Sequence, residues 1–209
     1  MGRNLDNKCK QCRRSGEKLF LKGDRCSSPK CAMVKRNYIP GVHGQKGRKR
    51  LSDYGLQLAE KQKAKKFYGL QEKQFRLTFE KAANKTGDAG KNFLRDLEMR
   101  LDNVVYRLGW ATSRSQARQL VNHGHFTVNS RKADIPSFSV KVGQVIKIKK
   151  SSQGNRYFKN LGEKLKKADR PSWLNFDTSD LSAKILHEPK DLDLPQNLNV
   201  QVIIEYYSK

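Results

Sequence analysis

The stretch from Arg100 to Lys149, RLDNVVYRLGWATSRSQARQLVNHGHFTVNSRKADIPSFSVKVGQVIKIK, decides the fold of this chain. Apolar residues at helical spacing predict one buried face of a first helix: Leu97, Leu101, Val104, Val105 and Leu108. Gly109 ends that helix. Ser113 begins a second helix, with Gln116 three residues later as its capping-box partner, and Gly124 ends it.

Two short strand-like runs follow the helices. Phe126–Val128 precedes a polar turn at Asn129 and Ser130, and residues 145–149 alternate apolar and basic side chains. Two helices and a small sheet in about fifty residues predict a compact unit that folds locally. With helical segments on either side of it, the chain is predicted to be α+β.

Basic side chains line the polar side of this unit. Residues 101–150 hold nine Lys and Arg against two acids, so we expect an unpaired row: Arg107, Arg114, Arg118, His123, Arg131 and Lys132. A solvated helix face normally mixes both signs of charge, so polyanion binding is the better interpretation. Arg114 and Arg118 lie one turn apart, where two guanidinium groups could clamp successive phosphates.

Composition supports a polyanionic partner. The 209 residues include 44 Lys and Arg against 20 Asp and Glu, a net charge of +24. Residues 1–50 carry +12, residues 51–100 carry +4, residues 101–150 carry +7 and residues 151–209 carry +1. No apolar run approaches a membrane span and the N-terminus has no signal-peptide core. We therefore expect a soluble intracellular protein with no membrane partner and no small-molecule substrate.

All four cysteines lie in residues 1–45. They form two close pairs, Cys9 with Cys12 and Cys26 with Cys31. Two thiolate pairs across a short loop suit a tetrahedral metal, and disulfides would not persist in a reducing compartment. We expect a structural Zn²⁺ ion, with an iron–sulfur cluster as the alternative occupant.

A glycine-rich basic loop follows the cysteines. Gly41, Gly44 and Gly47 allow close backbone approach, and positive charge comes from Lys46, Arg48, Lys49 and Arg50. We expect this loop to become ordered on RNA. Residues 52–83 then read as two helices, the first capped by Ser52 and ended by Gly69.

The last sixty residues or so are nearly neutral. They are expected to contain a helix over 155–168, strands over 181–186 and 200–207, and a docked Trp173. The acidic run 188–193 is expected to face solvent, because it would repel RNA. We expect three parts: a cysteine module with its loop (1–45), a helical body (46–98 with 163–209) and an RNA-binding domain (99–162).

Three segments of the deciding stretch resemble the RNA-binding domain named after small-subunit ribosomal protein four: Arg100–Gly109, Ser113–Val121 and Phe126–Asn129. Residues 51–55, 72–76 and 202–209 are similar to other parts of that ribosomal protein family. The resemblance covers most of the chain in order. It implies a structural protein that binds the 5′ domain of small-subunit ribosomal RNA and nucleates subunit assembly.

The resemblance also implies a location and neighbours. A member of the family would sit on cytoplasmic or organellar ribosomes, beside small-subunit protein five and near the path by which messenger RNA enters. There it would contribute to translational accuracy.

The competing hypotheses are a pseudouridine synthase or a stand-alone RNA-binding protein that uses the same domain. Arg100-Leu101-Asp102 superficially resembles the catalytic motif of those synthases. However, Asp102 lies inside a predicted helix, and the 59 residues after position 150 are too few for a catalytic domain. We expect Asp102 to orient a nearby arginine, and we expect no enzyme activity.

Overall fold

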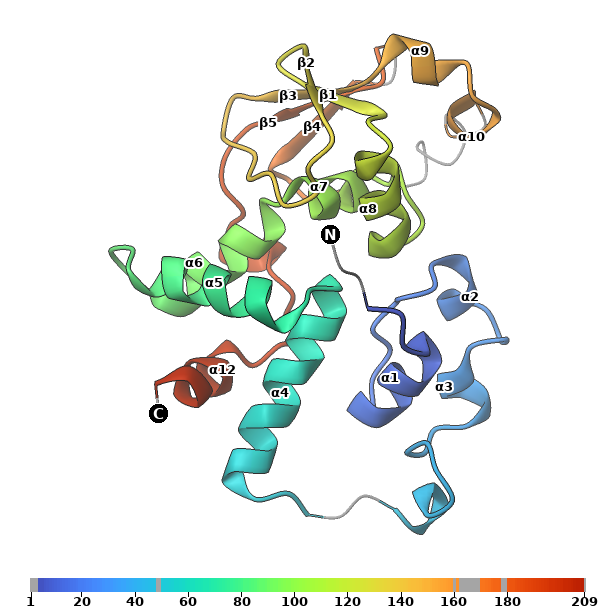
Figure 1. Ribbon diagram of the computed structural model, residues 1–209, viewed down its shortest axis with the longest axis vertical. Coiled ribbons are helices and arrows are strands. Elements are labelled where there is room, and N and C mark those ends of the chain that lie inside the picture. Colours follow the sequence, from blue (N-terminus) through green and yellow to red (C-terminus); the bar gives the residue numbers. More distant parts are fainter. Residues whose placement is uncertain (1–3, 48–49, 160, 162–169, 178–179, 209) are drawn as a thin grey trace. The chain divides into compact units, whose positions relative to one another are not determined.

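The computed structural model describes residues 4–47, 50–159, 161, 170–177 and 180–208. The chain forms two compact units. Unit 1 comprises residues 1–93 and 196–209, and unit 2 comprises residues 94–195. Figure 1 shows that unit 1 is helical and that unit 2 contains the sheet. This mixture of helices with one antiparallel sheet confirms the α+β class.

Unit 1 is built from helices. In chain order they are α1 (Lys8–Ser15), α2 (Asp24–Ser27), α3 (Ala32–Lys35), the 3-10 helix η1 (Gly44–Lys46), α4 (Asp53–Tyr68), α5 (Glu72–Ala83), the start of α6 (Ala89–Glu98) and α12 (Val200–Tyr207). Of these, α4 and α5 are the longest in the described part of unit 1. The Ser52 hydroxyl accepts the N–H of Gly55 at 3.3 Å, and Gly69 ends α4 with φ +67°. The predicted start and end of this helix are confirmed.

Aromatic side chains form the centre of unit 1. The Phe75 ring is fully buried and meets the Phe93 ring edge-on at 5.0 Å. The Tyr207 ring stacks on Phe79 at 4.6 Å, which joins α12 to α5. A Cβ atom on Gly90 would lie 2.9 Å from a methyl group of Val200, so glycine allows α6 to approach α12 closely.

The predicted strand over 200–207 is wrong, because these residues form α12. The apolar run VQVIIEYY fits both a buried strand and a helix, and periodicity alone does not separate them. Asn199 accepts the N–H of Val202 with its side chain and so caps the helix. Ile203 is fully buried. Packing against α4 and α5 therefore selects the helix.

Unit 2 combines short helices with the sheet. Its elements are the end of α6, α7 (Leu101–Arg107), α8 (Arg114–Asn122), β1 (Phe126–Val128), β2 (Arg131–Ala133), β3 (Val145–Ile148), α9 (Lys150–Gln153), α10 (Arg156–Lys159), β4 (Leu174–Asp177), β5 (Ser182–Ile185) and the 3-10 helix η2 (Asp191–Asp193). In the described part of the chain, no helix has the length and apolarity needed to cross a bilayer.

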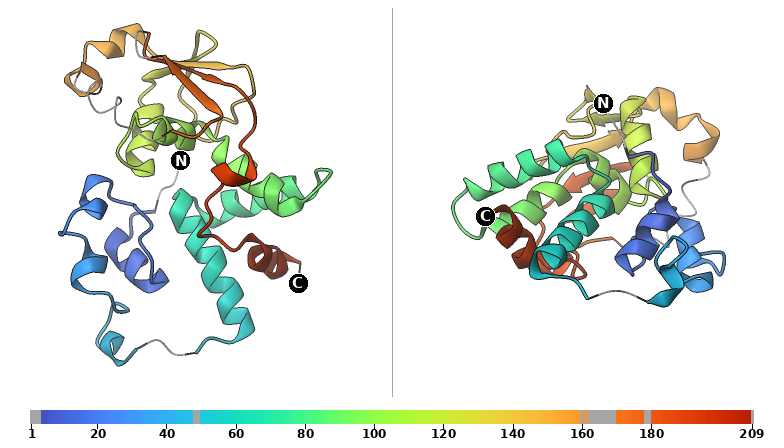
Figure 2. Two further views of the ribbon diagram at one scale, coloured as in Figure 1. Left: turned by 180° about the vertical axis from the view of Figure 1, so that it is seen from behind. Right: turned by 60° about the horizontal axis from the view of Figure 1, so that its bottom comes forward.

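The five strands form one antiparallel sheet in the order β2-β1-β3-β5-β4. Figure 1 labels the strands, and Figure 2 shows the chain from two further sides. Its inner face carries Phe126, Ile146 and Ile185, all fully buried. The Trp110 ring, which follows α7, stacks on Phe126 at 5.5 Å. Trp173 is also fully buried in this core. Asn129 and Ser130 both have positive φ, so the predicted polar turn forms a tight hairpin.

The single helix predicted through Leu97 and Leu108 is interrupted. Arg100 makes an isolated antiparallel bridge to Ser139, and the Leu101 N–H donates to the Phe138 carbonyl at 2.8 Å. These backbone bonds end α6 and start α7, although every apolar residue of the predicted face is buried. Long-range pairing therefore overrides the local helical pattern.

The structure divides the chain differently from the expected ranges. Strand β5 confirms the predicted strand over 181–186, but β4 and β5 pair with β3 and so belong to unit 2. The helix expected over 155–168 appears as α10, and most of its remaining length lies outside the described residues.

Candidate nucleic-acid interface

The start of α8 is fixed by side-chain hydrogen bonds. The Ser113 hydroxyl accepts the N–H of Gln116 at 3.3 Å, as a helix cap does. The Gln116 side-chain oxygen accepts from the Thr112 N–H at 2.9 Å and the Thr112 hydroxyl at 2.8 Å. The cap is confirmed, while Gln116 reaches one residue further back than a capping box requires. These bonds set the direction in which α8 presents its arginines.

Asp102 binds two arginines. Arg100 donates to its two carboxylate oxygens, from Nε at 3.1 Å and Nη2 at 2.8 Å. Arg118 donates from Nη1 at 3.1 Å. The side chains of Arg100 and Asp102 are 5% and 9% exposed, so little water screens their attraction. The expected role of Asp102 in orienting an arginine is confirmed.

A second buried carboxylate holds Arg107. Arg107 donates from Nε and Nη2 to the two oxygens of Glu98, each at 2.8 Å. The side-chain amide of Asn103 donates to the same carboxylate at 2.7 Å. The Glu98 side chain is 1% exposed, so the fork-to-fork pair with Arg107 keeps a buried charge neutralised.

Arg114 lies between these two groups of bonds. Its Nε donates to the Asn103 side-chain oxygen at 2.8 Å. Its guanidinium group lies over the Tyr106 ring at 4.5 Å, within cation–π distance. Both contacts tie the first turn of α8 to α7.

The expectation of an unpaired arginine row is therefore wrong for Arg107, Arg114 and Arg118. Counting acids within residues 101–150 missed Glu98, which lies just before that range. The break between α6 and α7 brings Glu98 back against Arg107, nine residues away in sequence. These guanidinium groups connect α6, α7 and α8 instead of projecting together into solvent.

Cations do project from the hairpin and the outer face of the sheet. His123, Arg131 and Lys132 are exposed, and Lys132 pairs with exposed Asp134 at 2.9 Å. The strand register places Lys132, Thr127 and Lys147 side by side on β2, β1 and β3. Lys147, Lys149 and Lys150 are exposed as well and were not among the predicted site residues; Lys147 pairs with exposed Asp180 at 3.2 Å. Of these three, Lys147 lies on β3, where apolar and basic residues alternate.

The histidines next to this surface differ. His125 is half-buried and its Nδ1 lies 2.9 Å from the Ser152 hydroxyl. Burial lowers the pKa of His125, and the neighbouring His123 lowers it further. His125 is therefore held neutral near pH 7, whereas exposed His123 faces solvent.

The basic loop of unit 1 is partly described. Lys46 and Arg50 are exposed, and Arg48 and Lys49 lie outside the described residues. Gly44 is buried, and a Cβ atom there would lie 1.7 Å from the Ile39 carbonyl oxygen. Glycine at this position therefore serves packing within the loop.

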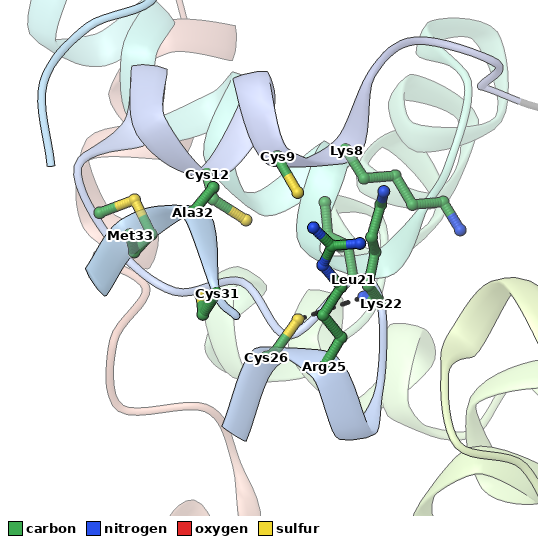
Figure 3. A pocket seen from close by; sticks show the side chains of 10 residues that line it. All are labelled: Lys8, Cys9, Cys12, Leu21, Lys22, Arg25, Cys26, Cys31, Ala32 and Met33. Carbon is green, nitrogen blue, oxygen red and sulfur yellow. Dashed lines mark hydrogen bonds between the residues drawn. The ribbon is translucent and has the colours of Figure 1, made fainter. Parts of the chain in front are cut away.

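The four cysteines line one small cavity (Figure 3). Cys9 and Cys12 lie on α1, Cys26 lies in α2, and Cys31 directly precedes α3. The cavity measures about 10 Å³, which is close to the size of one water molecule. All four thiols are free, and three of them are buried.

Burial and hydrogen bonds act in opposite directions on the thiols of this cavity. The Lys22 N–H donates to the Cys26 sulfur at 3.3 Å. Burial raises the pKa of Cys12, the other three cysteines raise it further, and a hydrogen bond from the Leu19 backbone opposes this. Four cysteines are a ligand set that structural metal sites use. Among the described residues, however, no three His, Cys, Asp or Glu side chains are arranged to hold one.

The fold and the exposed cations define a polyanion-binding protein of the α+β class. Two family models match the chain: the ribosomal protein S4/S9 N-terminal domain over residues 3–98 and the S4 domain over residues 99–146. The small ribosomal subunit protein uS4 of Clostridioides difficile strain 630 is 54% identical over 209 residues, covering all of both chains. The uS4 protein of Syntrophomonas wolfei is 51% identical over 209 residues, again with full coverage of both. The chain belongs to the uS4 family of small ribosomal subunit proteins.

Proposed function

We propose that this chain is a structural protein of the small ribosomal subunit and binds ribosomal RNA with its exposed basic surface. The observation that carries the proposal is a set of exposed cations at the hairpin and sheet of unit 2: Lys132 and Lys147 flank Thr127 on one face of the sheet, and exposed Arg131 precedes Lys132 in β2. Within the described residues, no acidic side chain pairs with Arg131. Family membership over the full length supports the same function.

A structural role is preferred to catalysis. The full-length relatives are named as ribosomal subunit proteins, which are not enzymes. Asp102, the one residue that resembled a synthase nucleophile, is engaged by Arg100 and Arg118 and nearly enclosed. A carboxylate held in this way serves packing and orientation.

The test compares RNA targets at one salt concentration. We expect the full chain to bind small-subunit ribosomal RNA more tightly than an equally long large-subunit fragment, by about a thousandfold. Filter binding with both RNAs in the same buffer, at about 0.15 M salt, would measure both affinities. Equal affinities would leave only non-specific polyanion binding and would contradict the proposal.

Finer assignments follow from the family resemblance and belong to the proposal. The 5′ domain is the proposed RNA target, and protein five of the same subunit and messenger RNA are the proposed neighbours. The 5′-domain assignment predicts that a transcript of this domain alone retains the affinity of the whole RNA. For the neighbours, the test is chemical cross-linking of assembled subunits, in which this chain should join to protein five and to messenger RNA.

We also propose a structural Zn²⁺ ion held by Cys9, Cys12, Cys26 and Cys31, with an iron–sulfur cluster as the alternative. The proposal is supported by the shared cavity and by backbone N–H groups that donate to two of the sulfurs. Lys8, Lys22 and Arg25 also line this cavity (Figure 3). Their charges would offset the two negative charges of a zinc ion with four thiolates.

Both tryptophans, Trp110 and Trp173, lie in unit 2, which gives the metal test two separate readouts. A chelator, or the double change Cys9→Ser and Cys26→Ser, should lower the far-ultraviolet helical signal and leave tryptophan emission unchanged. Met33→Leu, which alters the same cavity without removing a thiol, should have no effect. Elemental analysis should find about one zinc per chain; finding neither zinc nor iron would sink the proposal.

A further inference from the structure

A cleft of about 720 Å³ opens within unit 1 between the glycine-rich loop and α4. Apolar groups line it from both sides, including Ile39 and Pro40 of the loop and Leu58 and Ala59 of α4. Its volume lies in the range of cavities that enclose a ligand of nucleotide size. No residue of the exposed surface on unit 2 contributes to it.

The two carboxylates that line the cleft are already engaged. Lys63 is buried and binds Glu17 at 3.1 Å and Glu60 at 3.3 Å. Glu60 also accepts the backbone N–H of Asn199 at 2.8 Å. These bonds compensate the charge of Lys63 and leave one negative charge over among the three groups, so the positive charge of the cleft comes from other residues.

That charge is on Arg14 and Lys66. Both line the cleft, Arg14 from the last turn of α1 and Lys66 from the last turn of α4. The described residues supply neither one with an ion-pair partner. Burial lowers the pKa of Lys66, and the positive charges of Arg14 and Lys65 lower it further, against a weaker opposing effect of Asp6. Two cations crowded in this way would be stabilised by an anion between them.

We propose that this cleft holds one unpaired nucleotide of an RNA strand, with its base against the apolar lining and its phosphate between Arg14 and Lys66. This inference rests on the proposed RNA-binding function and deepens it. An unpaired nucleotide offers an apolar base face next to a phosphate, whereas an RNA duplex presents mainly phosphates and sugars. The cleft supplies both kinds of contact side by side.

The loop that forms one wall is shaped by glycine. Gly41 and Gly47 have φ values of +122° and +92°, which side chains other than glycine rarely adopt. Buried Gly44 closes the loop by donating its N–H to the Gly41 carbonyl at 3.1 Å. These glycines and this hydrogen bond give the wall its shape, and a bound nucleotide would hold the loop in that shape.

The experiment uses the full chain and two RNA probes, a labelled single-stranded octa-uridylate and a hairpin with an eight-base-pair stem. Ala59→Trp should fill the cleft, and Lys66→Ala should remove the phosphate contact. Each change should weaken binding of the single strand about tenfold, as expected for one charge-assisted hydrogen bond or one lost stacking site. The matched controls Ala59→Ser and Lys81→Ala, the latter an exposed lysine of α5, should change it less than twofold.

Fluorescence anisotropy measures these affinities, and far-ultraviolet spectra verify that each variant folds. Equal losses from Lys66→Ala and Lys81→Ala would mean general charge attraction and would overturn the assignment. Equal binding of strand and hairpin, with no response to Ala59→Trp, would overturn it as well. The affinity of the wild-type chain for small-subunit ribosomal RNA is measured in parallel. If the wild-type chain does not bind this RNA specifically, the proposed function is wrong. If it does bind, but Ala59→Trp and Lys66→Ala leave binding of the single strand unchanged, only the cleft assignment is wrong.

Discussion

At the scale of single residues, two buried carboxylates decide what the arginines of unit 2 do. Glu98 and Asp102 each accept several charge-assisted hydrogen bonds from side chains that looked free in the sequence. Burying such pairs gives little net stability, but removing one partner leaves a charge without compensation. The arginines they hold are therefore fixed in place, which is why the proposed RNA-binding surface consists of more exposed cations.

Changing Glu98 to Gln should destabilise unit 2 by about 2 kcal/mol. All the groups that reach the Glu98 carboxylate from Arg107 and Asn103 are donors, so an amide N–H₂ in its place would face another donor. Denaturant unfolding followed by tryptophan emission reports unit 2, because both tryptophans lie there. As a control, Asp134→Asn breaks an exposed pair with Lys132 and should leave the midpoint unchanged. Equal midpoints for both variants would contradict the prediction.

Replacing Arg131 should affect RNA binding, whereas replacing Arg118 should affect stability. Arg131→Ala should weaken RNA binding about tenfold and reduce the salt dependence by about 0.9, with unchanged stability, because the side chain is exposed. Arg118→Ala should cost about 1.5 kcal/mol of stability, because Asp102 then keeps only Arg100. Calorimetry and filter binding separate the two effects. If instead the Arg118→Ala variant binds RNA more weakly and keeps its melting temperature, the result would support the phosphate clamp that the sequence predicted for Arg114 and Arg118.

At the scale of elements, the sequence predicted the helix ends that are set by neighbouring residues. Ser52, Ser113 and Gly69 marked helix ends correctly, because a cap depends on neighbours within four residues. The residues of α12 were read as a strand, and one helix was predicted across Arg100, because partners distant in sequence determine both. The prediction of an unpaired arginine row was wrong for the same reason. Counting charges in a range of sequence does not show that Arg107 binds Glu98 or that Arg118 shares Asp102 with Arg100. The cations expected on the hairpin, Arg131 and Lys132, are exposed, and the ion pair between Lys132 and Asp134 joins residues two apart in sequence.

Because α12 is a helix, Ile203 should contribute more to stability than its neighbours in the same segment. Ile203→Ala should cost about 3 kcal/mol, because Ile203 is fully buried in unit 1. Gln201→Ala, an exposed change on the same helix, should cost little. Thermal unfolding followed by far-ultraviolet circular dichroism measures both. A strand would place Val202 with Val200 and Ile204 on one face, so a larger loss from Val202→Ala than from Ile203→Ala would speak against the helix.

At the scale of the whole molecule, the two units carry different shares of the charge. Unit 1 has a net charge of +16 and unit 2 has +8. The S4 domain match begins at residue 99, yet most of the positive charge lies before it. Because phosphate contacts release counterions, the salt dependence of binding counts these contacts and so reports which unit touches RNA.

Residues 94–195 alone should fold, because every residue of the main buried cluster lies within them. This fragment should bind ribosomal RNA with a shallower salt dependence than the full chain. If half of the sixteen net charges of unit 1 meet phosphates, the slope of log K against log salt should differ by about seven, at 0.9 per duplex contact. Filter binding between 0.1 and 0.4 M salt gives both slopes. Equal slopes would mean that unit 1 does not touch the RNA backbone. No phosphate would then lie between Arg14 and Lys66, and the nucleotide proposed for the cleft of unit 1 would be contradicted as well.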